Sequence, residues 1–272
     1  MTLLIDDSLV TAMIAVPLRE GWAETDVPLD VRERLMAADV TPEDVALLPA
    51  PEATLLGETH VLTSEIAVVL DGVGPIAMRT PVRPDDVDNA VVRLLDAGPT
   101  AEMLIRALLR PYFGITASGF ARTEDDPGAA EAQIVVIDGA AGLEQPESGY
   151  QDDLVRDWFV LTGQAVVSHV GVIGVRAFAR GAEPELAALR QAVAVGQERR
   201  KDVRGIVAAR WEVTDREALA EVTNRMRFAL TQADRNSLAN MVTRGSWGSR
   251  FGNRLPAFAD SLPDDVTDDR DV

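Results

Sequence analysis

The chain contains no cysteine and only two histidines, and this excludes several classes of functional site. Without cysteine there is no disulfide scaffold, iron–sulfur cluster, thiolate zinc site or cysteine nucleophile. The histidines, His60 and His169, lie too far apart for a zinc motif such as HExxH. No apolar run reaches the roughly 18 residues that a membrane span requires. We therefore expect neither a metal site nor a membrane segment.

Basic residues are outnumbered, because 26 lysines and arginines face 44 aspartates and glutamates, for a net charge of −18. Such a surface repels phosphate backbones, so we expect no nucleic-acid partner. A small anionic ligand is still compatible, since salt screens charges over about 8 Å and the local groups of a pocket decide what it binds. The first seven residues lack the basic region of a secretory signal, which favours a cytoplasmic protein.

At 272 residues the chain is near the length at which one core divides into two. Within its apolar runs, apolar residues do not alternate with polar ones, and the segments between these runs have apolar residues at helical spacing. This order is typical of an α/β fold with parallel sheets covered on both faces. The pattern predicts helices over 9–19, 27–38, 101–110, 152–161, 184–197 and 215–231. It predicts strands over 2–5, 45–48, 65–70, 75–80, 91–95, 134–137 and 165–175.

Ligands of open α/β sheets collect where strands end and helices begin, so the loops at those points are candidate parts of a site. These loops are Ser8–Ala12, Pro49–Glu52, Asp96–Ala101 and Asp138–Ala141. In the third loop Gly98 allows close backbone approach, Pro99 favours a turn and Thr100 is a favoured N-cap. The helix behind it offers free N–H groups that suit a carboxylate or phosphate, although an ordinary capped helix shows the same pattern.

Asp138 and His169 are candidates for proton transfer. Asp138 follows an apolar strand. A carboxylate at such a strand end, in a cleft, can act as a general acid or base. Alternatively, Asp138-Gly139 only forms a turn. His169 lies inside the run AVVSHVGVIGV, either as a hydrogen-bonded structural residue or as a catalytic one. Arg79, on a strand, could pair with a substrate carboxylate or simply face solvent.

A second glycine-rich segment, 245–249, is flanked by Arg244, Arg250 and Arg254. It fits neither the GxSxG nor the Walker pattern. Its arginines could bind an anion, or the segment is a mobile surface loop, which is the interpretation we favour. No GxGxxG sequence occurs, so a dinucleotide site has no support and we expect no cofactor.

Three segments have a distinctive order and spacing. The first is DVALLPAPE (44–52), a strand with a proline-containing exit. The second runs from DGVGP (71–75) through LDAGPT (95–100) to Leu108-Leu109. The third joins VIDGA (136–140) to the tryptophan segment DLVRDW (153–158) and to TGQAVV (162–167). Together they resemble the chorismate dehydratase family of the futalosine pathway of menaquinone biosynthesis.

The resemblance implies a two-lobed type 2 periplasmic-binding-protein-like fold with two crossover strands, near 66–79 and 166–176, and the ligand in the cleft between the lobes. We expect residues 1–73 and 172–260 to form lobe 1 and residues 74–171 to form lobe 2. The acidic segment 261–272 is expected to be a disordered tail.

The activity that the resemblance implies is the removal of water from chorismate, a small cyclic enol-pyruvyl carboxylate. Such a lyase needs an anchor for the carboxylate, a proton acceptor and a proton donor to the leaving hydroxyl. We expect Asp138 to be catalytic and the helix N-terminus at Thr100 to be the anchor. The residues expected to bind the substrate are Ser8, Thr11, Pro49, Ala50, Gly98, Thr100, Ala101, Gly139 and His169.

The chain departs from the family's pattern in its first loop. The family has an asparagine before a small-residue-Pro-Leu segment, and here Val16-Pro17-Leu18 is present while Val10 or Ile14 lies where the asparagine is expected. A polar group is thereby lost from the place that the dehydratase chemistry would use. The alternative function is therefore a cytoplasmic binding protein that closes on a small carboxylate without turnover. A transporter-associated solute receptor would need export, which the N-terminal residues do not indicate.

Overall fold

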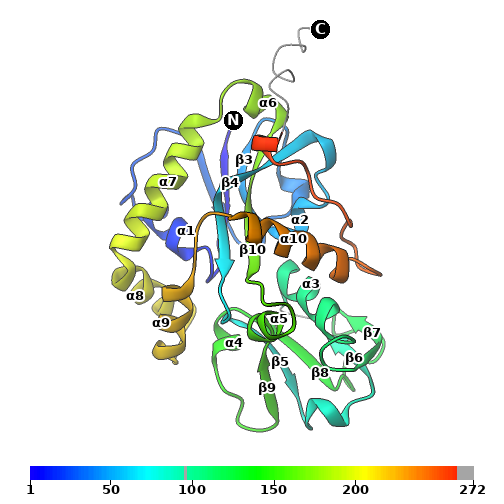
Figure 1. Ribbon diagram of the computed structural model, residues 1–272. Coiled ribbons are helices and arrows are strands. Elements are labelled where there is room, and N and C mark those ends of the chain that lie inside the picture. Colours follow the sequence, from blue (N-terminus) through cyan, green and yellow to red (C-terminus); the bar gives the residue numbers. More distant parts are fainter. Residues whose placement is uncertain (95–96, 262–272) are drawn as a thin grey trace.

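The computed structural model describes residues 1–94 and 97–261, and it has two lobes, each built around a five-stranded mixed sheet (Figure 1). The strand order in the first sheet is β2-β1-β3-β10-β4, and in the second it is β7-β6-β8-β5-β9. The first sheet contains β1 (Leu3–Asp6), β2 (Leu29–Arg32), β3 (Val45–Pro49), β4 (His60–Leu70) and β10 (Val166–Gly174). The second contains β5 (Ile76–Thr80), β6 (Asn89–Arg93), β7 (Thr116–Ala121), β8 (Ile134–Asp138) and β9 (Tyr150–Asp153).

Helices cover both faces of the first sheet. On one side lie α1 (Ala12–Arg19), α7 (Glu183–Glu198) and α8 (Arg200–Arg210), and on the other lie α2 (Ala50–Ala53) and α10 (Gln232–Gly245) (Figure 1). The other helices are α3 (Pro99–Leu108), α4 (Ala140–Leu143), α5 (Leu154–Thr162), α6 (Val175–Ala179) and α9 (Arg216–Arg225). Of the helices that the structure describes, none combines the length and the apolar character needed to cross a bilayer.

The central strand β10 explains why the apolar runs do not alternate. All nine of its residues are buried, because β3 and β4 pair with it on either edge and helices cover both faces. The expected parallel pairing is present in both sheets, but each sheet is mixed, since β10 runs antiparallel to both neighbours and β5 runs antiparallel to β8 and β9. The reversals occur in the strands that adjoin the two crossings between lobes.

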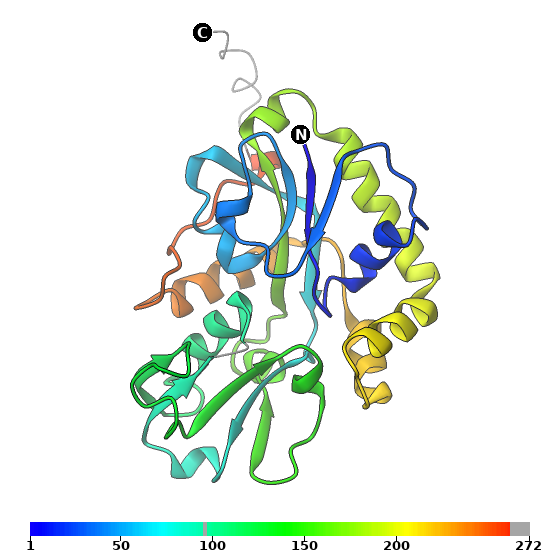
Figure 2. The same cartoon turned by 180° about the vertical axis from the view of Figure 1, so that it is seen from behind.

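The chain passes between the lobes twice, through 71–75 after β4 and through 163–165 before β10. Seen from behind, one lobe lies on each side of these two segments (Figure 2). Trp158 of α5 is fully buried beside the second crossing, and its indole N–H donates to Ser237 Oγ of α10 at 3.2 Å. Ser237 Oγ in turn donates to the carbonyl of Ala165 at 2.5 Å. This connection fixes the second lobe to the first on the hinge side.

The lobe boundary drawn at residue 171 falls inside a strand. Residues 166–171 belong to β10, which the described residues pair only within the first sheet. The boundary was placed inside the strand because nothing within an uninterrupted apolar run indicates where the chain passes from one lobe to the other. Of the expected acidic tail, 262–272 lie outside the described residues.

Two predicted helices differ from the structure. Segment 27–38 contains β2 and a 3₁₀ turn at Ala37–Asp39, because its backbone pairs in parallel with β1. The helix predicted over 215–231 ends at Arg225, because the chain then runs along β4, where Arg227 and Val69 exchange backbone hydrogen bonds of 3.1 and 2.9 Å. In both places pairing with a strand outweighs the helical spacing of a few apolar residues.

Gly196 allows α7 to pack directly on α1, since a Cβ there would lie 1.9 Å from the carbonyl oxygen of Met13. We expect Gly196→Ala to lower the melting temperature by several degrees, because overpacking costs about 1–3 kcal/mol. Gly205 of α8 is the matched control, since a Cβ there would have nothing within 4 Å. Gly205→Ala should leave the melting temperature unchanged or raise it, as alanine favours a helix by about 1 kcal/mol. Thermal unfolding followed by circular dichroism checks both, and equal responses would contradict the packing argument.

Candidate functional site

A cavity of about 410 Å³ lies between the lobes, at the ends of β1, β3 and β8 and beside the start of β10. This volume suits a small-molecule ligand, because typical ligand pockets occupy roughly 300–1,000 Å³. Both lobes contribute to its wall. The lining residues are 6–10, 33–36, Pro49, Leu70, Ile76, 97–100, 138–140, Ser168, His169, Trp211 and Arg250.

Most of the residues predicted from the sequence reach this cavity. Those that line it are Ser8, Pro49, Gly98, Thr100, Asp138, Gly139 and His169. Thr11, Ala50 and Ala101 do not line it and are fully buried. Their side chains face the core, and the Thr11 hydroxyl donates to the carbonyl oxygen of Asp6 at 2.6 Å.

Asp138 ends β8 at the cavity wall, where it is partly exposed. Its Oδ1 accepts the N–H of Gly139 at 2.8 Å and its Oδ2 accepts the N–H of Gly98 at 3.2 Å. Burial raises the pKa of Asp138 from 3.8 to about 6, against the opposing effect of these two hydrogen bonds. The group therefore changes its protonation state close to neutral pH, as a general acid or base requires.

The N-terminus of α3 faces the same part of the cavity. Gly98 is required here, since a Cβ would lie 2.7 Å from Asp138 Oδ2. The Thr100 hydroxyl donates to the carbonyl oxygen of Ser168 at 2.8 Å, so its hydrogen is already engaged across the lobes. The helix begins at Pro99, which has no N–H, and the N–H groups of Thr100 and Ala101 have no intrahelical acceptor. What this end offers to an anion is therefore its backbone and its partial positive charge.

His169 is held between two partners. Its Nε2 lies 3.0 Å from Asp6 Oδ2 and its Nδ1 lies 2.9 Å from Ser168 Oγ. Because a carboxylate only accepts, Nε2 carries the hydrogen. The other oxygen of Asp6, Oδ1, accepts the N–H of Leu35 at 2.9 Å. The histidine is thus a hydrogen-bonded part of the wall and also one of the residues that face the cavity.

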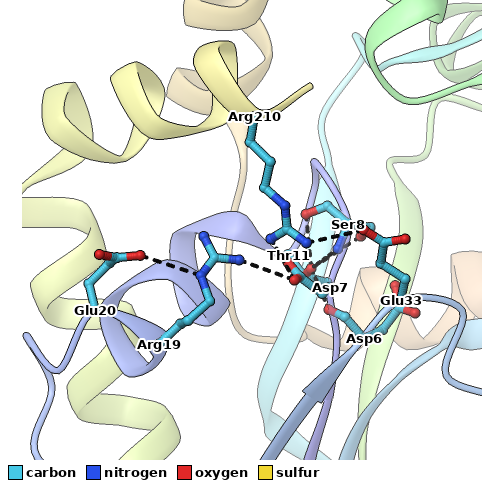
Figure 3. A network of polar contacts seen from close by, with 8 residues as sticks. All are labelled: Asp6, Asp7, Ser8, Thr11, Arg19, Glu20, Glu33 and Arg210. Carbon is cyan, nitrogen blue, oxygen red and sulfur yellow. Dashed lines mark hydrogen bonds and ion pairs between the residues drawn. The ribbon is translucent and has the colours of Figure 1, made fainter. Parts of the chain in front are cut away.

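The neighbouring carboxylate, Asp7, is neutralised from two helices (Figure 3). Its Oδ2 accepts from Arg19 at 3.1 Å and from Arg210 at 2.6 Å, while its Oδ1 is buried without a hydrogen-bond partner. Arg210 also donates to Glu33 at 3.1 Å. The acidic residues on this side of the cavity therefore already have cationic partners.

Several lining residues were not predicted, among them Asp6, Asp7, Arg34 and Trp211. The pair Asp6-Asp7 directly follows a buried strand, and that signal was available in the sequence. The position of Arg34 depends on the backbone of a loop, and no sequence pattern marks it. Trp211 comes from the turn after α8, which is remote in sequence from every other lining segment.

Two arginines that the sequence offered as anion-binding candidates have structural partners. Arg79 does not line the cavity; it donates to Gln151 at 2.6 Å and to two carbonyl oxygens of the segment that follows β8. Arg250 does line the cavity, where it forms an ion pair with Glu52, a residue only 1% exposed. The segment 245–249 is therefore not merely a surface loop, since the residue that follows it reaches the cleft.

Glu144 connects the lobes at the opposite end of the cleft from the hinge. It follows α4, and its Oε1 accepts the N–H groups of Thr214 and Asp215, at 2.8 and 3.1 Å. Its Oε2 accepts the hydroxyl of Thr214. Thr214 and Asp215 directly precede α9, whose N-cap is Asp215, so a carboxylate of the second lobe binds the segment that leads into a helix of the first. This contact joins the two lobes.

Over residues 1–94 and 97–261, no group of three or more His, Asp or Glu side chains is arranged to hold a metal ion.

The comparisons with known proteins concern the fold. No family model matches the sequence, and no curated protein matches it. Protein AF1704 from Archaeoglobus fulgidus superimposes with a TM-score of 0.61 at 12% identity, over 91% of this chain and 97% of its own. The periplasmic aliphatic sulphonate binding protein SsuA from Escherichia coli gives 0.59 at 13% identity, over 96% and 94%. The Candida albicans CA3427 product, described as having the generic periplasmic binding protein fold, gives 0.54 at 9% identity, over 98% and 99%. The chain therefore has the two-lobed periplasmic-binding-protein fold predicted from its sequence.

The raised pKa of Asp138 predicts a pH-dependent contribution to stability. Because the folded pKa of about 6 exceeds the usual 3.8, this contribution is fully present below about pH 4 and is lost as the pH rises through 6. Asp138→Asn should therefore raise the melting temperature relative to wild type at about pH 8, with a smaller difference at about pH 5.

Asp126 provides a control of opposite sign, since hydrogen bonds from the N–H groups of Arg122 and Thr123 lower its pKa. Asp126→Asn should lower the melting temperature at neutral pH, and this loss should shrink as the pH falls. A difference between Asp138→Asn and wild type that does not vary with pH would contradict the assignment.

Removal of the Glu144 contact should open the cleft. Hydrogen bonds from the Thr214 hydroxyl and from two amides lower the pKa of Glu144, so the contact is intact at neutral pH and is lost as the pH falls through that lowered value. We expect Glu144→Ala to increase the radius of gyration measured by small-angle X-ray scattering. Glu147→Ala, a change at an exposed residue of the same segment, should leave it unchanged. Identical scattering from both variants would show that other contacts close the lobes.

Proposed function

We propose that the chain is a chorismate-dehydratase-like lyase of menaquinone biosynthesis, which binds a small cyclic enol-pyruvyl carboxylate between its lobes and removes water from it. The observation that carries this proposal is Asp138, a carboxylic acid in the wall of the cavity between the lobes, with a pKa of about 6. Elimination of water requires a group of this kind, which takes a proton from carbon and gives one to oxygen.

The charges around the cavity support an anionic substrate. Asp7 and Glu33 are paired with arginines, which reduces the repulsion that the acidic lining exerts on an anion. The N-terminus of α3 adds a partial positive charge at the wall formed by the second lobe. The structural neighbour SsuA is named an aliphatic sulphonate binding protein, so a protein of this fold that binds a small anion is already known.

In the proposed step, Asp138 alone both accepts and returns the proton. Asp138, as a carboxylate, accepts the proton from the ring carbon next to the one that bears the hydroxyl. The ring carbon–oxygen bond breaks, the electron pair of the carbon–hydrogen bond forms the new double bond, and Asp138 returns its proton to the leaving hydroxyl, which departs as water. Closure of the lobes excludes bulk water during this transfer.

The second candidate is a cytoplasmic protein that binds the carboxylate without turnover. It is favoured by Val10, one of the positions at which the family's asparagine was expected, because this residue lines the cavity with an apolar side chain. The other such position, Ile14, is fully buried and does not reach the cavity. The first loop thus lacks the family's polar group at the substrate.

Chorismate added to the purified protein separates the two candidates. We expect it to raise the melting temperature, since a ligand that binds the folded state stabilises it by mass action, and to be converted to a carboxyvinyloxy-benzoate seen by chromatography. A raised melting temperature with unchanged chorismate would identify the binding protein. If chorismate neither raises the melting temperature nor is converted, both candidates are wrong.

Substitution of Asp138 tests the catalytic assignment. Asp138→Asn should reduce kcat by at least about 100-fold, because general acid–base catalysis contributes that much, while chorismate still raises the melting temperature. The wild-type rate should increase as the pH rises through about 6, where Asp138 becomes the base.

Asp153 supplies the matched control, since burial also raises its pKa to about 6 but it caps α5 outside the cavity. Asp153→Asn should therefore keep its turnover at temperatures where it remains folded. Equal loss of turnover in both variants would point to a structural effect.

A further inference from the structure

Arg34 differs from every other charged residue around the cavity. It lies in the loop after β2, is exposed, and lines the cleft. Among the charged lining residues that the structure describes, it alone has neither an ion pair nor a side-chain hydrogen bond. Arg250, the other arginine of the wall, is paired with Glu52. Arg34 is thus the cation of the cavity that remains available to a ligand.

The backbone of Arg34 has a φ of +57°, in the left-handed region that residues other than glycine, asparagine and aspartate rarely adopt. Such a conformation costs free energy and persists where its surroundings impose it. Here the next residue imposes it, since the Leu35 side chain is fully buried and its N–H donates to Asp6 Oδ1. Two residues further on, the N–H of Ala37 donates to Glu52 Oε2 at 3.0 Å.

Two buried carboxylates therefore hold the loop directly after Arg34. Asp6 also contacts His169, and Glu52 also pairs with Arg250, so both anchors belong to the cavity wall. A strained residue at a binding cleft is a reason to look for a function. The position keeps a guanidinium at the cleft where glycine would fit the backbone better.

We propose that Arg34 is the residue of the first lobe that pairs with the anionic group of the ligand, a carboxylate or a sulfonate. A guanidinium binds either group through two parallel N–H donors, which adds directional selectivity to the charge attraction. The proposal rests on the proposed function only in that the cleft binds a small carboxylate. It assigns Arg34 to ligand selection, opposite Asp138 of the second lobe.

Calorimetric titration with chorismate, and with benzoate and its uncharged isostere benzamide, tests the assignment. We expect Arg34→Ala to weaken chorismate and benzoate binding by about tenfold or more, and to abolish the preference for benzoate over benzamide. Arg34→Lys keeps the charge but not the two parallel N–H donors, so it should recover part of the lost affinity. Arg83→Ala is the matched control, because Arg83 is also exposed, has no side-chain partner in the part of the chain that the structure describes, and does not line the cavity.

Arg34→Gly separates binding from folding. Glycine adopts the left-handed conformation without strain, so this variant should melt at or above the wild-type temperature while it loses affinity as Arg34→Ala does. Unchanged affinity of Arg34→Ala for a carboxylate that wild type binds would overturn the role of Arg34 and leave the proposed function intact. Failure of wild type to bind any of the probes would overturn both.

Discussion

The carboxylate of Asp6 is the contact on which the geometry of the cavity depends. It is buried at the end of β1, and its two oxygens engage His169 of β10 and the N–H of Leu35 in the loop after β2. A buried carboxylate is costly unless its oxygens are hydrogen-bonded, so these three segments cannot shift independently. The positions of His169 and of Arg34 beside Leu35 both follow from this one group. The wall of the first lobe is therefore ordered before any ligand arrives.

The second constraint is that the two halves of the site come from different lobes. Asp138 and the start of α3 belong to the second lobe, while Asp6, Arg34 and His169 belong to the first. Contacts between the lobes, such as the Thr100 hydroxyl with the Ser168 carbonyl, bring the two halves together. A ligand that touches both halves is bound best when the cleft is closed, and closure also removes the water that would compete with a proton transfer. Under the proposed function, ligand binding and proton transfer therefore both require the closed cleft.

Much of the fold was predictable because the central strands are buried on both faces. A strand such as β10 must be apolar throughout, so its presence and extent were visible as an uninterrupted run. The errors occur at the edges, where the helical spacing over 27–38 and 215–231 gave way to pairing with β1 and β4. Candidate ligand residues were found where a loop follows a buried strand, as at Asp138. They were misassigned where such a residue faces the core, as with Thr11.

By itself the sequence determined the α/β class and the loops from which ligand contacts arise, because both follow from local apolar patterns and strand ends. The two-lobed fold was expected from the resemblance of three segments to a known family. Only the tertiary structure decided which polar groups of the cleft are already paired and which are available. Arg79 is engaged within its lobe, Arg250 is paired with a buried glutamate, and Arg34 has no side-chain partner among residues 1–94 and 97–261. Hydrogen bonds between residues far apart in the chain determine this difference. The burial that raises the pKa of Asp138 likewise exists only after the lobes have folded and met.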